Sequence, residues 1–146
     1  MSIIIKTVSS KKDFMTFARF ANKLYKGNKY YVPSMPMDDI STFSKEKNAA
    51  FEFSDAEFYL AYKDGEVVGR VAAIINHKAN DAWKVKQVRF GWIDFIDDIQ
   101  VSTALLDAVT AFGKAHGMNQ VVGPLGFTDF DPEGMLVEGF DRLSTM

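Results

Sequence analysis

Residues 87–117 hold the groups best placed for chemistry, because an apolar extended stretch there gives way to a long helical pattern. Residues 87–96 are mostly apolar, and from Val101 onward apolar side chains recur at steps of three and four, which is typical of an amphipathic helix. The first turn of such a helix has backbone N–H groups without intrahelical partners, and these groups favour anions. The junction therefore predicts a crevice for an anionic cofactor, with free donors at Val101 and Ser102.

Two acidic residues, Asp97 and Asp98, stand directly before that helix. A helix N-terminus carries roughly half a positive charge, which two carboxylates would more than neutralise. Aspartate is also a good N-cap, so we expect Asp98 to accept a hydrogen bond from the first turn. The two acids are therefore expected to stabilise the helix while they weaken the anion site.

A strand, a helix and a long connection come first in the chain. Residues 3–8 predict the strand, and Ser10 with Asp13 three residues later approximates a capping box that begins the helix. Residues 29–54 show no regular pattern apart from a short helix expected at 38–43, and connections of this length often line a site. Their large side chains form either one wall of a pocket or the edge of the core: Tyr30, Tyr31, Met35, Met37 and Phe43.

An antiparallel hairpin is expected in the middle of the chain. The Asp-Gly pair at residues 64–65 separates two apolar runs, residues 58–62 and 66–75, and this pair is a strong hairpin signal. Residues 76–86 are polar and predict a connection to the next strand.

The apolar stretch before the long helix suits a central strand, and Gly91 within it indicates a bulge or the close approach of another segment. Gly117 supplies a helix stop. Residues 119–127 predict a last strand, parallel to the central one because a helix joins the two. The fold class expected is a mixed α/β (α+β) sheet with an antiparallel hairpin and a parallel β-α-β unit.

Length and composition narrow the class of protein. The 146 residues predict a single domain (1–146), and 47% apolar residues without any long apolar run indicate a globular chain that does not cross a membrane. The absence of cysteine excludes disulfides, thiol nucleophiles and thiolate metal sites. A net charge of −2 without a basic block argues against nucleic acid as a partner. The first residues are too weakly apolar for a signal peptide, so a cytoplasmic location is expected.

The order of these elements resembles that of the GNAT superfamily of acyl-CoA-dependent N-acyltransferases. Residues 67–73 (VVGRVAA) look like the family's third strand, and Leu105 and Leu106 together with residues 114–117 resemble its motif A helix. The resemblance spans nearly the whole chain. It implies a GNAT-like mixed sheet, an acyl-CoA cofactor such as acetyl-CoA, and a small-molecule amine as the acceptor.

More narrowly, residues 25–28 with 31–33, and residues 123–127 with 134–141, resemble a little-characterised bacterial subgroup of GNAT-like proteins. In the family a further helix and one or two strands follow the strand expected at 119–127. The resemblance therefore implies an N-terminal portion of a longer protein, with the C-terminal helix and strands missing, or a fold completed by another chain. An apolar last strand with an open side also predicts self-association.

In the family, a Gln/Arg-x-x-Gly-x-Gly/Ala turn holds the cofactor pyrophosphate at the helix N-terminus. Aligned on the motif A helix, this turn falls on residues 97–102, where Asp97, Gln100 and Ser102 depart from it. The departures predict a degenerate pyrophosphate loop. The resemblance still implies a cofactor site around this loop, formed by Phe95, Ile96, Val101, Ser102 and Thr103.

A GNAT enzyme also needs a general base for the attacking amine. Asp94 on the central strand is the candidate, with a purely structural strand carboxylate as the alternative. His77, expected in the loop after the hairpin, and His116, at the end of the long helix, are interpreted as solitary surface residues. The family's usual thiolate-protonating tyrosine lies on the helix that the chain lacks.

The acids Asp129, Asp131 and Glu133 superficially resemble a calcium loop, but Pro132 intrudes and Phe140 stands at the twelfth position. We expect an acidic turn that leads into a short helix, and no metal.

Three hypotheses follow. An enzyme would leave a gap between the strands ending at Ile96 and Phe127 that admits a pantetheine arm. A non-catalytic GNAT-like module for structure or small-molecule sensing would have a closed pocket elsewhere, and an interaction domain would show neither.

Overall fold

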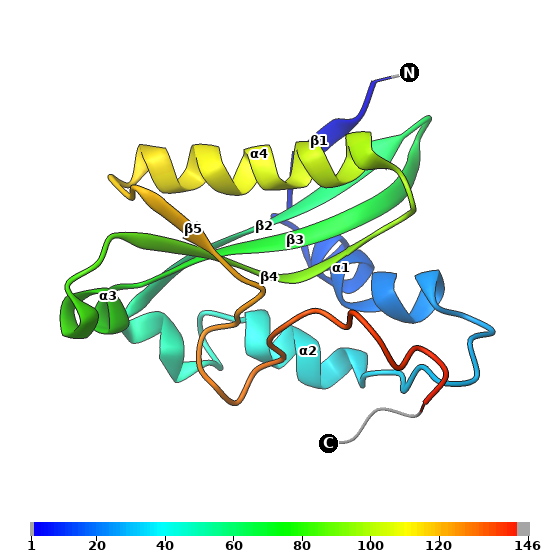
Figure 1. Ribbon diagram of the computed structural model, residues 1–146, viewed down its shortest axis with the longest axis horizontal. Helices are drawn as coiled ribbons and strands as arrows, with labels where there is room; N and C mark the ends of the chain where they lie inside the picture. Colours follow the sequence, from blue (N-terminus) through cyan, green and yellow to red (C-terminus); the bar gives the residue numbers. More distant parts are fainter. Residues whose placement is uncertain (1, 143–146) are drawn as a thin grey trace.

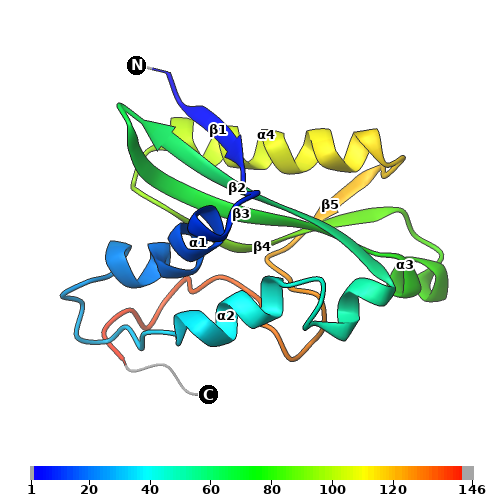
Figure 2. The same ribbon diagram turned by 180° about the vertical axis from the view of Figure 1, so that it is seen from behind.

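A five-stranded sheet with helices on both faces forms the framework of the molecule (Figures 1 and 2). The computed structural model describes residues 2–142. Its elements follow in the order β1 (Ile4–Thr7), α1 (Lys11–Leu24), α2 (Pro36–Phe43), the 3-10 helix η1 (Ala49–Glu52), β2 (Ser54–Lys63), β3 (Glu66–Asn76), α3 (His77–Trp83), β4 (Gln87–Phe95), α4 (Ile99–Ala115) and β5 (Gln120–Val122).

The strands lie in the order β1-β2-β3-β4-β5. The first three neighbouring pairs are antiparallel, whereas β5 runs parallel to β4, with Val88 beside Val121. The chain returns from β4 to β5 through α4, which crosses one face of the sheet (Figure 1). This topology confirms the expected mixed sheet, its hairpin and its β-α-β unit.

Each face of the sheet has its own apolar core. Because side chains alternate along a strand, β2 and β3 contribute to both cores. Under α4 the buried residues include Val71, Ile75, Val88, Val101, Leu105 and Val109, and under α1 and α2 they include Phe17, Phe43, Phe58, Leu60, Ile74 and Phe127.

Helix α4 packs closely on the sheet at two glycines. A methyl group on Gly69 of β3 would lie 2.9 Å from Val101 Cγ1, and one on Gly113 of α4 would lie 2.6 Å from Val88 Cγ1. The helix ends as expected at Gly117, whose φ is +78°. The Gly69 contact lies near the N-terminus of α4 and the Gly113 contact near its C-terminus, so the helix is held against the sheet at both ends.

The helix caps explain where α1 and α2 begin. Ser10 is the N-cap of α1, and its Oγ accepts a hydrogen bond from Asp13 N at 3.1 Å. Helix α2 begins at Pro36, which suits the first position of a helix because proline lacks a donor there. Both helices confirm the sequence expectations.

Four local expectations were wrong. The connection at 76–86 contains the helix α3, whose seven residues are too few to show an apolar stripe in the sequence. Asn76 is its N-cap, and Asn76 Oδ1 accepts a hydrogen bond from Ala79 N at 2.9 Å. The connection at 29–54 also contains η1. The last strand has three residues rather than nine, and no short helix follows the acidic turn within residues 128–142.

Within the residues that the structure describes, no helix is long and apolar enough to cross a membrane. No group of three or more histidine and acidic side chains is arranged to hold a metal ion in residues 2–142.

Candidate active site

Asp94, near the end of β4, belongs to a buried ion pair. Its Oδ2 accepts a hydrogen bond from Arg70 Nε at 3.0 Å and lies 2.9 Å from Arg70 Nη2, and its Oδ1 accepts a hydrogen bond from Tyr25 OH at 2.9 Å. The Arg70 side chain is only 6% exposed and also donates from Nη1 to the Phe17 carbonyl at 2.7 Å. The bonds to Arg70 and Tyr25 fix the orientation of the Asp94 carboxylate. Because the Asp94 side chain is 17% exposed, solvent still reaches it.

Polar groups from α1 and the following loop continue this site. The ring of Tyr31 lies 4.8 Å from that of Tyr25, and Tyr31 OH donates to Asn22 Oδ1 at 2.7 Å. Asn22 Oδ1 also accepts from Ser34 N at 3.2 Å, and Ser34 Oγ donates to Asp39 Oδ2 at 2.6 Å. The contact between the two tyrosine rings places this set of hydrogen bonds, which joins α1 to α2, beside the Asp94 ion pair of β3 and β4.

The protonation states in this network follow from burial. Burial raises the pKa of Tyr25, and the charge of Asp94 and the hydrogen bond to it act in the same direction. Burial likewise raises the pKa of Tyr31 and of Asp39. Both tyrosines therefore remain protonated near neutral pH, and Tyr25 acts as a donor to the Asp94 carboxylate.

A bulge in β4 sits beside this site. Trp92 has a φ of +46°, and the β3–β4 register shifts between Arg70 and Ala72. A side chain on Gly91 would collide with the Leu125 carbonyl, so the glycine marks the close approach of another segment that the sequence predicted. The chain leaves β4 here, because β5 pairs only with residues 87–89. Beyond the bulge, the outer edge of β4 has no neighbouring strand within residues 2–142.

The N-terminus of α4 lies at the end of that open edge. Asp98 is its N-cap, as expected, and Asp98 Oδ1 accepts from Gln100 N at 2.9 Å. This hydrogen bond and the Lys63 ammonium, 3.1 Å from Oδ2, lower the pKa of Asp98. The prediction of free donors at Val101 and Ser102 was wrong. Both amides bond to the Asp98 carbonyl, at 3.0 and 3.3 Å, because the helix begins at Ile99.

The five cofactor-site residues expected from the sequence lie around the junction between β4 and α4. The Val101 side chain is buried in the core under α4, and those of Phe95 and Ile96 pack against that core while staying partly exposed. Ser102 Oγ donates back to the Ile99 carbonyl at 3.1 Å, and Thr103 is exposed. Asp94 belongs instead with α1, on the other side of the strand.

The two histidines are less isolated than the sequence suggested. His77 is the first residue of α3 rather than a loop residue, and its Nε2 lies 2.8 Å from Asp55 Oδ2. His116 Nδ1 lies 2.8 Å from the Phe112 carbonyl. In the acidic turn, Asp131 Oδ2 accepts from the backbone of Phe127 and Thr128, so its carboxylate has a structural partner.

Sequence reasoning found Asp94 but missed its partners. Arg70 stands inside the apolar run of β3, and a charged residue in such a place needs a buried partner. That signal could have paired it with an acid on the next strand. Nothing local could have identified Tyr25, which is 69 residues from Asp94 in the sequence.

Two curated bacterial proteins are similar in sequence. The chain is 30% identical over 138 residues to "Protein YghO" of Escherichia coli K12, which covers 94% of this chain and 35% of that protein. It is 26% identical over 143 residues to "Bacterial ceramide synthase" of Caulobacter vibrioides, covering 97% of this chain and 36% of that one. The chain thus spans about a third of the length of these relatives. No family model matches it.

Solved structures identify the fold. The ribosomal-protein-alanine N-acetyltransferase of Brucella melitensis superposes with a TM-score of 0.57 at 16% identity, over 84% of this chain and 79% of that one. A tandem GNAT protein from the clavulanic acid biosynthesis pathway gives 0.57 at 11% identity, over 80% of this chain and 34% of the other. The chain has the GNAT fold.

A third GNAT-fold match was solved with a ligand. A predicted acetyltransferase from Clostridium acetobutylicum, in a structure with acetyl-CoA, gives a TM-score of 0.57 at 10% identity, over 82% of this chain and 79% of that protein. At such low identities, these similarities establish the GNAT fold but do not show which reaction this chain catalyses.

Proposed function

We propose that this chain is a GNAT-like N-acyltransferase domain that transfers an acyl group from acyl-CoA to an amine. The acyl-CoA arm lies along the open edge of β4, between the bulge at Trp92 and the start of α4, and the acceptor amine approaches Asp94 from the side of α1. The observation that carries the proposal is the Asp94 carboxylate, which is held by Arg70 and Tyr25 directly beside that edge.

Asp94 has the geometry of a base or of an anchor for an ammonium group. Its Oδ1 accepts one hydrogen bond, from Tyr25, and a carboxylate oxygen can accept a second. In the reaction the amine nitrogen attacks the thioester carbonyl carbon, the C–N bond forms, and the C–S bond breaks with its electron pair on sulfur. The proton from the amine passes to Asp94, directly or through water, and is then returned through water to the thiolate, which leaves Asp94 ionised again.

The acceptor class we favour is a lipid amine. The likeness to a protein named a ceramide synthase supports it, since a ceramide is the amide of a fatty acid. Exposed apolar side chains also occur in the loop before α2 and in the segment that follows β5, both on the α2 side of the sheet (Figure 1). In the loop these residues are Val32 and Met35, followed by Met37 in the first turn of α2, and after β5 they are Phe130, Met135, Leu136, Val137 and Phe140.

A non-catalytic GNAT-like module is the second candidate. It is favoured by the same N-terminus of α4, where carboxylates at Asp97 and Asp98 stand near the expected pyrophosphate position and the amides of Val101 and Ser102 are already bonded. Both features weaken anion binding at this helix, so affinity for acyl-CoA separates the two candidates.

Calorimetric titration with acetyl-CoA makes this separation. We expect saturable binding by the wild type and roughly two- to fivefold tighter binding by Asp98→Asn, because asparagine is an equally good N-cap and removes a negative charge beside the ligand phosphates. Asp107→Asn is the matched control, since Asp107 lies on the exposed side of α4 and its loss of charge should leave the affinity unchanged. Absence of heat up to millimolar acetyl-CoA in all three proteins would refute the enzyme and favour the module.

A further inference from the structure

The N-terminal half of β2 has a neighbouring strand on one side only. The ten-residue β2 pairs with β3 along its length, whereas β1 covers only Tyr59 to Tyr62. The last contact with the N-terminal segment is the hydrogen bond from Val8 N to the Phe58 carbonyl, at 2.8 Å. Because outward-facing backbone groups recur every second residue, Ala56 turns its N–H and C=O toward the open edge.

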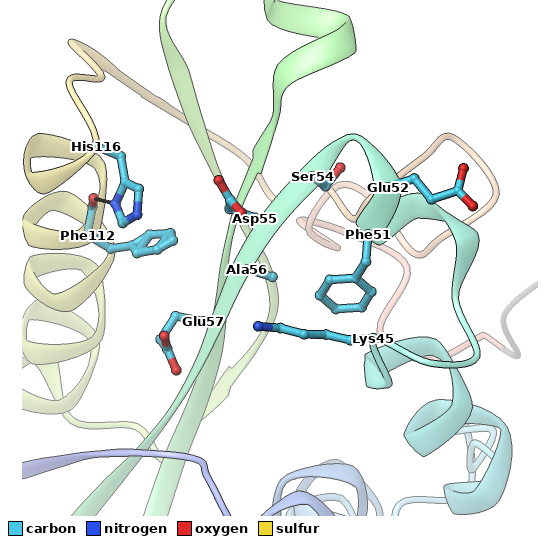
Figure 3. Close-up of a pocket in the computed structure, with 9 residues that line it drawn as sticks. All are labelled: Lys45, Phe51, Glu52, Ser54, Asp55, Ala56, Glu57, Phe112 and His116. Atoms are coloured by element: carbon cyan, nitrogen blue, oxygen red, sulfur yellow. Dashed lines mark hydrogen bonds between the residues drawn. The ribbon is translucent and has the colours of Figure 1, made fainter.

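A pocket of about 470 Å³ lies along this edge, as Figure 3 shows. Lys45 and Phe51, from the α2 and η1 side, form one wall, and Phe112 and His116 at the end of α4 form the other. Ala56 lies between the two walls. A ligand in this pocket would therefore contact the unpaired backbone of β2 in the middle, and side chains from both faces of the sheet on either side.

The charge of the pocket favours a cationic occupant. Three acids line it, Glu52, Asp55 and Glu57, against Lys45 and His116. Asp55 is engaged by His77 at 2.8 Å, but Glu57 forms no ion pair or side-chain hydrogen bond with any residue from 2 to 142. Glu57 is half-buried, and burial raises the pKa of its carboxyl, while the charges of Lys45 and His116 across the pocket act in the opposite direction without forming an ion pair with it. A half-buried carboxylate without a partner gains from an incoming ammonium or guanidinium group.

A second copy of the chain is a poor occupant. Antiparallel pairing of two β2 strands about a two-fold axis at Ala56 would bring the Asp55 and Glu57 carboxylates of the two copies face to face, because both side chains lie on the α4 side of β2. Like charges directly opposite in a sheet are destabilising. The same acids would complement an extended segment that carries lysine or arginine at alternate positions.

We propose that the open edge of β2, at residues 54–57, binds an extended basic peptide segment of another protein as an added strand. The peptide backbone pairs with Ala56, and a lysine or arginine on the α4 side of the new strand reaches Glu57. Strand addition of this kind takes its affinity from main-chain hydrogen bonds and its specificity from alternate side chains. The site is separate from the Asp94 network and does not depend on acyl transfer.

A capped hexapeptide of alternating lysine and valine is the probe, followed by amide NMR of the protein. We expect saturable shifts confined to residues 54–57 and the pocket walls, slower hydrogen exchange at the Ala56 amide, and at least tenfold weaker binding when glutamate replaces lysine in the peptide. Shifts that do not saturate, that map to β4 or β5, or that are equal for the acidic peptide would overturn the proposal.

Two variants separate the backbone contribution from the charge. Ala56→Pro removes an outward N–H without disturbing the β3 ladder, since proline is tolerated on an edge strand, and should abolish binding. Glu57→Gln keeps the size of the side chain and should weaken peptide binding several-fold. This variant tests the proposal even if Ala56→Pro does not fold. Asp107→Asn is again the matched charge control. Unchanged affinity in Glu57→Gln would contradict the assigned role of that carboxylate.

Discussion

Asp94→Asn is expected to lower the rate of acyl transfer by about a hundredfold or more, because a positioned general base typically contributes a factor of 10² to 10⁴. Asparagine keeps an oxygen toward Arg70 but cannot take the proton of the amine. The measurement is thiol release from acetyl-CoA and from palmitoyl-CoA, with dodecylamine as the lipid amine acceptor and the aminoglycoside sisomicin as the polar one.

Two controls separate catalysis from folding in this experiment. Affinity for acetyl-CoA should remain close to the wild-type value, because Asp94 lies on the α1 side of β4, and circular dichroism should show a folded variant. Tyr25→Phe removes one hydrogen bond to the carboxylate but leaves its charge, so its rate should fall less than that of Asp94→Asn. Equal rates in Asp94→Asn and the wild type would eliminate Asp94 as the base.

Arg70→Met is expected to lower the free energy of unfolding by about 3–5 kcal/mol, the usual cost of removing one partner of a buried ion pair. Methionine fills much of the same space, but the Phe17 carbonyl loses its donor and the Asp94 carboxylate loses its counter-charge. Unfolding in urea, followed by circular dichroism, gives the difference in free energy.

The same buried pair predicts a rescue. Arg70→Met combined with Asp94→Leu should recover most of the lost stability, because replacing both partners by apolar side chains leaves no uncompensated charge. Lys63→Met, which breaks the more exposed pair with Asp98, should change stability far less. If Arg70→Met unfolds at the same urea concentration as the wild type, the ion pair does not hold the site together.

Much of the fold could be predicted from local signals in the sequence. The stripe of α4, the caps at Ser10 and Asp98 and the Asp-Gly turn of the hairpin each depend on residues a few positions apart. The early end of β5 was missed, although Pro124 is a local signal against a strand that continues to residue 127. Residues 119–127 are apolar like a strand, but Pro124 offers no donor for a ladder and Phe127 enters the core on the opposite face.

The candidate site shows the same division. Asp94 could be proposed because it stands on a central strand near a helix N-terminus. Its partners come from α1 and β3, and only the folded sheet brings Tyr25 and Arg70 to its two oxygens. The amides of Val101 and Ser102 were assigned wrongly because the helix starts at Ile99, two residues before its first buried side chain.

Mapping of acetyl-CoA onto the wild-type protein by amide NMR tests the central claim most directly. If this chain binds acyl-CoA at the open edge of β4, the largest shifts will fall on residues 92–96 and on the first turn of α4, with smaller ones around Asp94. Shifts confined to other parts of the sheet, or none at saturating acetyl-CoA, would contradict an acyltransferase site at this edge.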